Sequence, residues 1–357
     1  MIHAAVIGCG RMGAFTSDGV RQYAPRAWFP LAHAEAIVAA EGVSLEALVD
    51  PDPDRLSEAA KLYGAGRTYA DHTAMLAEGA PDLVGIATRT LGRAAIIADC
   101  AAAGTRALHI EKPICNSMAE LDDLEALFAR DDVFATLGAV RRHFAIYGEA
   151  IRRASDGTIG NLFEARVDMG QGALLWTHPH SVDLLLLAAG ERELVSVSAR
   201  LGEVGRDGAV IRNDPVVLQA TLEFDDGFVG QFARGFGTDF TLSGSLGSVA
   251  VLNDGHALWQ SGGGEAGDNP YPEPQRQEFD AGDVPQGALA PILQLVACLN
   301  GNETARAANS ALKRDILRGQ KALFAMVQSH LEGGRAVSLN DIDPAMVIEG
   351  RTGQFYA

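Results

Sequence analysis

Positively charged residues are scarce in this 357-residue chain: 29 lysines and arginines face 46 aspartates and glutamates, a net charge of −17. A chain this acidic repels phosphate backbones and anionic lipid headgroups, so we expect no nucleic-acid partner and no membrane partner. No apolar run approaches the roughly 18 residues of a membrane span, and the N-terminus lacks the basic start of a signal peptide. These absences favour a cytoplasmic protein.

Cysteine is equally scarce. The four cysteines lie far apart and form no CxxC pair, at positions Cys9, Cys100, Cys115 and Cys298. This spacing favours reduced thiols over a disulfide framework or a structural zinc site. At about 150 residues per domain, the length predicts two domains, each large enough to bury a core without cross-links.

Residues 1–138 alternate short apolar runs with stretches of helical spacing. The runs that predict strands are residues 4–8, 45–50, 83–88, 107–111 and 133–138. Between them lie predicted helices at residues 55–63, 70–78, 93–103 and 118–130. Strand–helix alternation with continuously apolar strands is typical of a doubly wound parallel sheet, so we expect an α/β domain of the Rossmann type here.

Residues 139–357 have a different texture, because strand-like runs follow one another directly. They are residues 161–170, 194–201, 216–224, 228–235, 240–244 and 248–252, interrupted by predicted helices at 179–189 and 311–331. The Asp225-Asp226-Gly227 run between two of these strands favours a hairpin. We therefore expect an α+β second domain with an antiparallel sheet.

The first predicted strand runs directly into a GxGxxG motif. Gly8 permits the tight turn, Gly10 lets a pyrophosphate approach the backbone, and Gly13 allows close packing of helix on strand. Because the N-terminus of the following helix favours negative charge, this context predicts a dinucleotide site. The residues of its loop are Gly8, Cys9, Gly10, Arg11, Met12 and Gly13.

Asp50 closes the second predicted strand, where an acidic side chain binds the ribose hydroxyls of NAD and repels the 2′-phosphate of NADP. We therefore expect NAD as the cofactor, with NADP less favoured. Asp50 lies further beyond Gly13 than the usual spacing of about 20 residues, which indicates an insertion at residues 16–33. Within it, Trp28 is a candidate cover for a substrate ring. Packing of the insertion on its own domain or on another subunit is the alternative.

Two further segments carry candidate catalytic groups. Lys112 follows the predicted strand at 107–111, at the sheet edge where parallel sheets bind ligands. His180 begins a predicted helix behind Pro179, and Asp183 lies on the same helix face. An imidazole titrates near neutral pH, so His180 suits a general base whose ring Asp183 orients. Lys112 suits a hydrogen-bond donor to a developing alkoxide.

With these segments the chain resembles the Gfo/Idh/MocA family of NAD(P)-dependent sugar and cyclitol oxidoreductases. The resemblance rests on the GxGxxG motif, residues 81–88, the Glu111-Lys112-Pro113 triplet and the pair His180 and Asp183. It continues over Arg141-Arg142 and residues 157–160, 224–227 and 333–337. The order of the motifs along the chain makes the combination specific, although each motif alone is weak.

The resemblance implies a Rossmann domain followed by a domain with a large, open, mostly antiparallel sheet. It also implies a homodimer or homotetramer joined through that sheet, and oxidation of a secondary hydroxyl of a sugar, a sugar derivative or an inositol-like cyclitol. It adds Thr88, Arg89 and Glu111 to the expected cofactor site. The expected substrate site comprises Trp176, His178, His180, Arg142 and His143.

The chain departs from the family pattern where the substrate is expected. Trp176 occupies a position, four residues before His180, where members often carry an Asp, and its indole cannot accept a proton. This leaves His178 or water to complete the proton path. Arg89 and Arg93 stand where a Pro and a His are usual after the strand end.

Two other functions fit the same motifs. One is an NAD-dependent glycosidase that oxidises its substrate transiently, and the other is a non-catalytic dinucleotide-binding sensor, which Trp176 leaves open. We expect no metal, because no third close His or Cys accompanies His178, His180 and Asp183.

Overall fold

The computed structural model describes residues 1–170, 172–263, 269 and 271–350. Within that range the contacts divide the chain into two compact units. Unit 1 comprises Met1–Val140 and Pro285–Leu317, and unit 2 comprises Arg141–Val284 and Arg318–Gly350. The sequence placed the boundary between residues 138 and 139 and left residues 285–317 in the second domain, whereas their contacts join them to unit 1.

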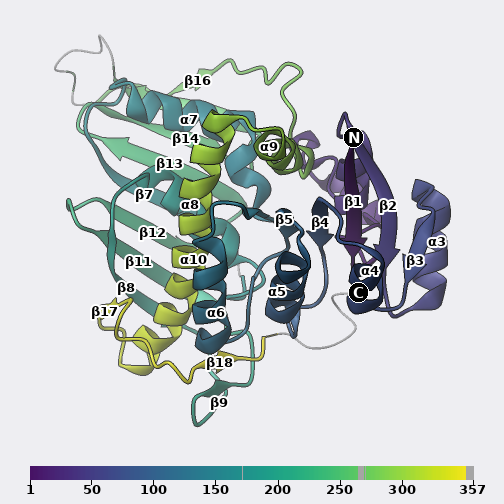
Figure 1. Cartoon of the computed structure of the whole chain (residues 1–357). Coiled ribbons are helices and arrows are strands. Elements are labelled where there is room, and N and C mark those ends of the chain that lie inside the picture. Colours follow the sequence, from purple (N-terminus) through teal and green to yellow (C-terminus); the bar gives the residue numbers. More distant parts are fainter. Residues whose placement is uncertain (171, 264–268, 270, 351–357) are drawn as a thin grey trace. The chain divides into compact units, whose positions relative to one another are not determined.

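Unit 1 is built on a six-stranded parallel sheet with helices between its strands, which confirms the predicted Rossmann-type fold (Figure 1). In spatial order the strands are β3 (Arg67–Tyr69), β2 (Val43–Val49), β1 (Ile2–Ile7), β4 (Leu83–Ile86), β5 (Ala107–Ile110) and β6 (Phe134–Leu137). The helices before residue 140 are α1 (Asp18–Tyr23), α2 (His33–Ala39), α3 (Pro53–Tyr63), α4 (His72–Glu78), α5 (Arg93–Ala103) and α6 (Met118–Phe128). The strand order reverses between β1 and β4, and such sheets bind ligands at the carboxyl ends of the strands beside this reversal.

Local sequence fixes the helices that follow β2 and β5. Asp52 caps α3, because its Oδ1 accepts a hydrogen bond from the backbone N–H of Asp54 at 3.1 Å. Ser117 and Glu120 form a capping box at the start of α6. These caps come shortly after the ends of the two strands, so they also fix the loops that carry Asp50 and Lys112.

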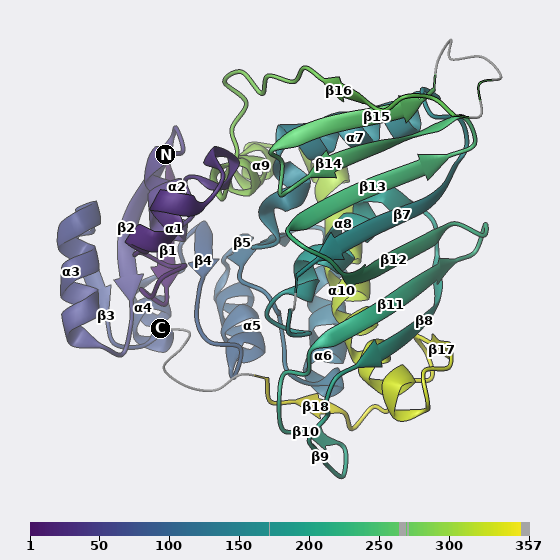
Figure 2. The same ribbon diagram turned by 180° about the vertical axis from the view of Figure 1, so that it is seen from behind.

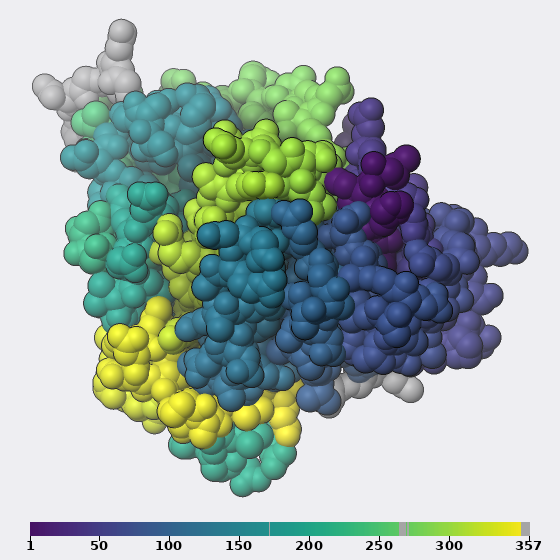
Figure 3. All heavy atoms as spheres, in the orientation of Figure 1, coloured from purple at the N-terminus to yellow at the C-terminus, as the bar shows by residue number. Residues whose placement is uncertain are grey.

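Residues 285–317 complete the core of unit 1, although the whole of residues 141–284 separates them from its other part in the sequence. Helix α9 (Leu289–Leu299) packs on β5 and β6, where Ile292 is fully buried. Helix α10 (Glu303–Leu331) begins in this unit, and Asn309 Nδ2 donates to the carbonyl oxygen of Ala135 at 2.9 Å. Figure 3 shows the lime-green atoms of this segment directly beside the blue atoms of the first 140 residues.

Unit 2 is built on a nine-stranded sheet, which confirms the large and mostly antiparallel sheet that the resemblance implied. In spatial order its strands are β16 (Gln275–Gln277), β15 (Ala257–Gly262), β14 (Gly247–Leu252), β13 (Thr238–Gly244), β7 (Leu162–Met169), β12 (Val229–Arg234), β11 (Val217–Phe224), β8 (Leu194–Leu201) and β17 (Val337–Ser338). Strands β7 and β12 run parallel, and all other neighbours in the sheet are antiparallel. A small separate sheet contains β9 (Arg206–Asp207), β10 (Val210–Ile211) and β18 (Val347–Ile348).

Helices cover one face of the nine-stranded sheet, and Figure 2 shows the sheet from its other face. Helix α7 (Ala145–Ser155) packs on β13 and β14, and α8 (His178–Ala189) packs on β7 and β12. Along β7, Val167 is fully buried, whereas Arg166 and Asp168 point to the opposite face and pair at 2.7 Å. Within the described part of unit 2, no helix covers that opposite face (Figure 2).

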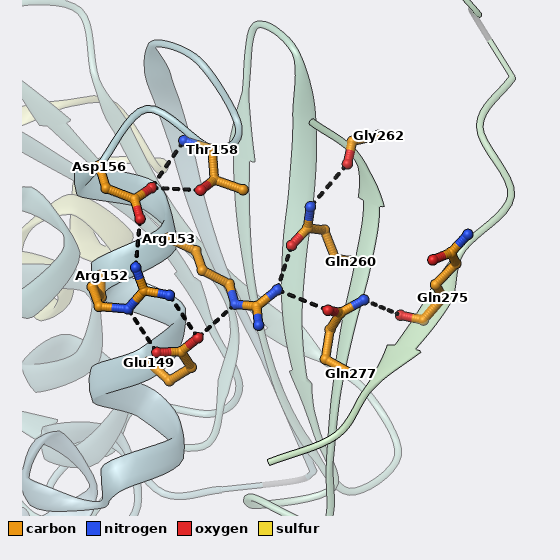
Figure 4. Close-up of polar contacts among 9 residues, drawn as sticks. All are labelled: Glu149, Arg152, Arg153, Asp156, Thr158, Gln260, Gly262, Gln275 and Gln277. Carbon is orange, nitrogen blue, oxygen red and sulfur yellow. Dashed lines mark hydrogen bonds and ion pairs between the residues drawn. The ribbon is translucent and has the colours of Figure 1, made fainter. Parts of the chain in front are cut away.

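Arg153 of α7 ties the edge strand β16 and its neighbour β15 to the unit (Figure 4). Its Nη1 donates to Gln260 Oε1 at 2.6 Å and to Gln277 Oε1 at 2.9 Å, while its Nε donates to Glu149 at 2.8 Å. Hydrogen bonds from Arg152 and Arg153 lower the pKa of Glu149 to about 2. The charged cluster therefore stays ionised near neutral pH and holds β16, whose three residues are too few for an apolar pattern of their own.

No helix in the described residues is long and apolar enough to cross a membrane. All four cysteines are free and buried, and burial raises the pKa of the Cys9 thiol to about 12. Thiols in such surroundings are poor nucleophiles, so we assign the four cysteines to the core of unit 1.

Candidate active site

The GxGxxG loop leaves the end of β1 and needs glycine at its first and last positions. Gly8 has a φ of +93°, and a Cβ there would lie 2.8 Å from the backbone carbonyl of Ala87. A Cβ on Gly13 would lie 1.7 Å from the carbonyl oxygen of Gly8. A Cβ on Gly10, by contrast, would meet nothing within 4 Å, so there is space at the position where this motif brings a pyrophosphate to the backbone. The loop therefore fits a dinucleotide phosphate.

An insertion splits the helix that follows this loop. One helical turn begins at Gly10, residues 15–32 then leave it, and α2 continues the interrupted turn. The backbone N–H of His33 donates to Met12 O, and that of Ala34 donates to Gly13 O, both at 2.8 Å. These hydrogen bonds connect the dinucleotide loop to α2 although the insertion separates the two in the sequence.

The insertion packs on the segment that precedes α9. Gly287 N donates to Ala27 O and Ala288 N donates to Pro30 O, both at 2.8 Å. A Cβ on Gly287 would lie 2.5 Å from the carbonyl oxygen of Trp28. Both segments belong to unit 1, so the structure favours packing of the insertion on its own domain. Contact of Trp28 with a substrate ring stays a prediction.

Asp50 lies at the end of β2, only 4% exposed, beside the dinucleotide loop. Its Oδ2 accepts a hydrogen bond from Cys9 N at 2.7 Å, and its Oδ1 accepts one from Asp52 N at 2.9 Å. Arg55 Nη1 lies 3.7 Å from Oδ1. The carboxylate is therefore fixed at the strand end where a ribose-binding acid is expected.

Arg93 joins the ends of β4 and β5, a role that sequence reasoning missed. Its buried guanidinium donates to the carbonyl oxygens of Glu111, at 2.8 Å, of Pro113 and of Thr88. Burial lowers the pKa of Arg93 to about 10, so the side chain stays charged near neutral pH. The sequence predicts Arg93 near the substrate, whereas these contacts make it a buried link between the two strand ends. Thr88 Oγ1 is buried without a hydrogen-bond partner, whereas Arg89 is exposed.

Glu111 and Lys112 follow β5, and the Glu111 carboxylate is buried with Oε1 3.2 Å from His33 Nε2. Burial alone would raise the pKa of Glu111, but the His33 hydrogen bond and the charges of His33, Lys112 and Arg93 outweigh it and lower the pKa. A Cβ on Gly138 would lie 2.5 Å from Oε1. Lys112 follows directly, is half-buried at the carboxyl edge of the sheet, and is close enough for its charge to act on this carboxylate.

Helix α8 of unit 2 carries two histidines in different surroundings. The ring of His178 is buried and stacks on Phe232, with centroids 4.8 Å apart and Nδ1 3.1 Å from Ser181 Oγ. Burial lowers the pKa of His178 to about 4. The ring packs on the sheet but its buried Nε2 has no hydrogen-bond partner, so the substrate contact or proton relay of His178 stays a prediction. His180 is half-buried in the first turn of α8, and its backbone N–H donates to Thr177 O at 3.3 Å.

Asp183 forms a buried ion pair with Arg142. The Nε of Arg142 donates to both carboxylate oxygens, at 2.8 and 2.9 Å, and Nη2 donates to the carbonyl oxygen of Asp183 at 3.2 Å. The structure thus joins Asp183 and Arg142 to each other, and the expected pairing of Asp183 with His180 and of Arg142 with a substrate stays a prediction. The neighbouring His143 has a buried Nε2 without a hydrogen-bond partner, and burial and the charge of Arg142 lower its pKa to about 3. Neutral His143 can therefore donate to or accept from a ligand.

The segment before α8 is anchored by Asp214, which sequence reasoning also missed. Its carboxylate oxygens accept hydrogen bonds from Leu175 N at 2.7 Å and Trp176 N at 3.1 Å. These bonds fix the half-buried Trp176 about one turn before His180. In the sequence, Asp214 precedes a proline and looks like an ordinary turn residue, so nothing there indicates this contact.

Comparison with known proteins identifies the N-terminal part of the chain. A family model named GFO_IDH_MocA and described as an oxidoreductase family with an NAD-binding Rossmann fold matches residues 2–139. Residues 2–139 are thus similar in sequence to the Gfo/Idh/MocA oxidoreductase family. This confirms the resemblance seen in the sequence and the NAD-binding class of the first domain.

Relatives of the Gfo/Idh/MocA domain extend the comparison. D-apiose dehydrogenase of Paraburkholderia graminis is 29% identical over 163 residues, which make up 46% of this chain and 39% of that protein. The match therefore spans well under half of that relative. An oxidoreductase of Agrobacterium radiobacter, solved with NAD+, L-tartaric acid and magnesium, covers 95% of this chain and 98% of its own at 19% identity and a TM-score of 0.70.

A second solved structure is a putative myo-inositol dehydrogenase of Sinorhizobium meliloti 1021. It covers 95% of this chain and 100% of its own, at 20% identity and a TM-score of 0.68. At such identities the likeness concerns the fold. It shows that other proteins join a Rossmann-type unit to a unit with the fold of unit 2.

Proposed function

We propose that the protein is an NAD-dependent dehydrogenase that transfers hydride between nicotinamide and a secondary hydroxyl of a sugar, sugar derivative or cyclitol. The observation that carries the proposal is the carboxyl edge of the six-stranded sheet. There, the open backbone at Gly10, the fixed carboxylate of Asp50 and the half-buried Lys112 lie on one NAD-binding domain. The apiose and putative inositol dehydrogenases among the similar proteins support a polyhydroxylated substrate.

The residues of the loop bind the cofactor by fitting its phosphates and ribose. Gly10 leaves room for the pyrophosphate. The carboxylate of Asp50 accepts hydrogen bonds from the ribose hydroxyls and repels the negative charge of a 2′-phosphate. Thr88 Oγ1 gains in the cofactor the hydrogen-bond partner that the protein does not provide. Arg89 and Glu111 complete the same edge.

Lys112 and His180 carry the proton chemistry. When bound, the nicotinamide ring accepts the hydride. His180 takes the proton of the substrate hydroxyl, and Lys112 donates a hydrogen bond to the oxygen as negative charge develops on it. Asp183, held by Arg142, fixes the first turns of α8 and so the backbone from which His180 projects. With Trp176 in place of an acid and His178 packed on the sheet, the proton leaves His180 through water.

The test is incubation of the protein with NAD and a panel of sugars, sugar acids and inositols, read as absorbance of reduced cofactor. Net reduction with a panel member is the expected result. Cleavage of an aryl glycoside without net reduction would instead indicate the glycosidase. Cofactor binding without any turnover would indicate a sensor, a function that the Arg142–Asp183 pair and Trp176 also permit.

We further propose that a second copy of the chain covers the face of the nine-stranded sheet that no described helix covers. A row of side chains crosses this face in register, and its members are half-buried or small, apart from one arginine: Ser198, Thr221, Gln231, Arg166, Thr241, Ala250 and Trp259. A flat row of this kind suits a self-complementary contact. Light scattering is expected to show a dimer or tetramer, and Thr221→Glu is expected to dissociate it. A wild-type monomer at high concentration would contradict the proposal.

We also propose a reducing, cytoplasmic location, in keeping with four free cysteines.

A further inference from the structure

A buried polar cluster lies at the carboxyl end of the sheet in unit 1, outside the chemistry described so far. Its central contact joins His33 Nε2 to Glu111 Oε1 at 3.2 Å, with side chains that are 0% and 6% exposed. The His33 ring lies 4.4 Å, between centroids, from that of His109, whose Nδ1 is 2.9 Å from Thr136 Oγ1. These contacts place two histidines, a carboxylate and a hydroxyl in the interior of a dinucleotide-binding domain.

The backbone around the cluster reserves space for it. A Cβ on Gly85 of β4 would lie 3.0 Å from His33 Nδ1, and one on Gly138, after β6, would lie 2.5 Å from Glu111 Oε1. Glycine at these two strand ends thus leaves the space that the side chains of His33 and Glu111 occupy. An arrangement that buries a carboxylate is costly unless its partners are in place, so the partners of Glu111 matter.

The groups that carry, or on protonation can carry, positive charge near the Glu111 carboxylate come from three elements. They are His33 at the start of α2, Arg93 at the start of α5 and Lys112 directly after Glu111. Arg93 donates to the main-chain oxygen of Glu111, so among these groups it is His33 that hydrogen-bonds the carboxylate itself. The backbone N–H of His33 also donates to Met12 of the dinucleotide loop.

We propose that His33 is a positioning residue for Lys112: its hydrogen bond keeps Glu111 as a fixed carboxylate beside the lysine. The inference rests on the function proposed for Lys112. A buried carboxylate that loses its hydrogen-bond donor takes up a proton. The charge of Glu111 favours the ammonium form of Lys112, which is the form that donates to a developing alkoxide. His33 thereby connects the cofactor loop to the group that stabilises the reacting oxygen.

The test measures the pKa of Lys112 without requiring turnover. The protein is acetylated with acetic anhydride over a range of pH, and the extent of modification of Lys112 is read by peptide mass spectrometry. We expect His33→Leu to lower the pKa of Lys112 by about one unit, because Glu111 then loses its charge, and Glu111→Gln to give the same shift. His33→Gln keeps an amide donor near the carboxylate and is expected to restore most of the wild-type value.

Thr136→Val is the matched control, because it removes a polar group of the same cluster that bonds to His109 instead of Glu111. It is expected to leave the pKa of Lys112 unchanged. An unchanged pKa in His33→Leu and Glu111→Gln would overturn the proposal. If His33→Leu does not fold, the comparison of His33→Gln with His33→Asn decides, since the shorter amide does not reach Glu111 and is expected to show the lowered pKa.

Activity provides a second readout that separates this inference from the proposed function. With a substrate identified, the alkaline limb of kcat/KM is expected to move to lower pH in His33→Leu by the same amount as the pKa of Lys112. If the labelling shift is present but no alcohol is oxidised, the proposed function fails and the positioning of Lys112 stands. If alcohol is oxidised but the labelling shift is absent, the positioning role fails alone.

Discussion

The Nε of Arg142 donates to both carboxylate oxygens of Asp183, at 2.8 and 2.9 Å, inside unit 2. The two side chains are only 9% and 5% exposed, so water cannot replace either partner. Asp183 belongs to α8, the helix whose first turn carries His180. The candidate general base is therefore held on a helix that a buried ion pair fixes to the chain segment before α7.

Breaking this pair on one side is expected to destabilise the protein strongly. Arg142→Met leaves a buried carboxylate without its partner, and we expect a loss of about 3–5 kcal/mol in the free energy of unfolding, measured in urea. Adding Asp183→Leu removes the unpaired charge and is expected to restore most of that loss. If the loss in the double variant equals the sum of the losses in Arg142→Met and in Asp183→Leu alone, the two residues are not coupled. Turnover is expected to remain low in the double variant, because the helix start loses its fixed orientation.

The buried ring of His178 is expected to make stability depend on pH. Its pKa is lowered to about 4 by burial, whereas an unfolded histidine titrates near 6.5. Between these values the unfolded chain binds more protons, so stability is full above pH ~6.5 and decreases as the pH falls toward ~4. His178→Phe, which keeps the stacking on Phe232, is expected to remove about 3 kcal/mol of this decrease. Denaturant unfolding across this range tests it, and parallel curves for the two proteins would contradict it.

The packing of the insertion on residues 285–288 can be tested with two glycines. Gly287 and Gly282 have φ values of +57° and +56°, so alanine is strained at both. Only at Gly287 would the Cβ also meet carbonyl oxygens of the insertion, at 2.5 Å. We expect Gly287→Ala to lose about 2 kcal/mol more stability than Gly282→Ala. Equal melting temperatures in calorimetry would show that the insertion does not pack there.

Asp50 is expected to set the preference for NAD over NADP. A 2′-phosphate near this carboxylate would place like charges together, at a cost of a few kcal/mol. Asp50→Asn retains an oxygen that accepts the Cys9 hydrogen bond but has no charge, whereas Asp50→Ala loses both. We expect Asp50→Asn to lower the ratio of kcat/KM with NAD to kcat/KM with NADP. Asp50→Ala is expected to lower this ratio and also to weaken the binding of both cofactors. Better use of NADP by the wild type would contradict the assignment.

Much of the fold could be predicted, because the evidence lies within short stretches of sequence. Strands β1, β4 and β5 are apolar apart from one histidine each in β1 and β5, and such strands need cover on both faces of the sheet. Strands β3 and β16 have three residues each, and no pattern can develop over that length. Helix α9 was missed as part of the first domain because its buried face is defined by β5 and β6, far away in the sequence.

The same division holds for the candidate site. Gly8, Asp50 and Lys112 were predicted because each function is tied to a position relative to a strand end. The partners His33 and Arg93 were not, since they reach the residues after β5 only through folding. A sequence pattern indicates which residue carries a charge. Which other residue forms a hydrogen bond or an ion pair with it is decided by the fold.

Lys112→Ala and His180→Ala are expected to separate chemistry from cofactor binding. On the proposed mechanism both act at the reacting oxygen, so each variant loses roughly 10²-fold or more in kcat. The dissociation constant for NAD, measured by calorimetric titration, is expected to stay nearly unchanged. Near-normal kcat in either variant would remove that residue from the mechanism.

The most direct test of the central claim is the fate of the hydrogen on the carbinol carbon. A substrate from the panel is deuterated at that carbon, incubated with the protein and NAD, and the reduced cofactor is analysed by mass spectrometry. The account predicts that the deuterium appears on the nicotinamide ring, at a rate that falls in Lys112→Ala. Reduced cofactor without deuterium, or deuterium released to solvent with no reduced cofactor, would contradict hydride transfer from a secondary alcohol to NAD.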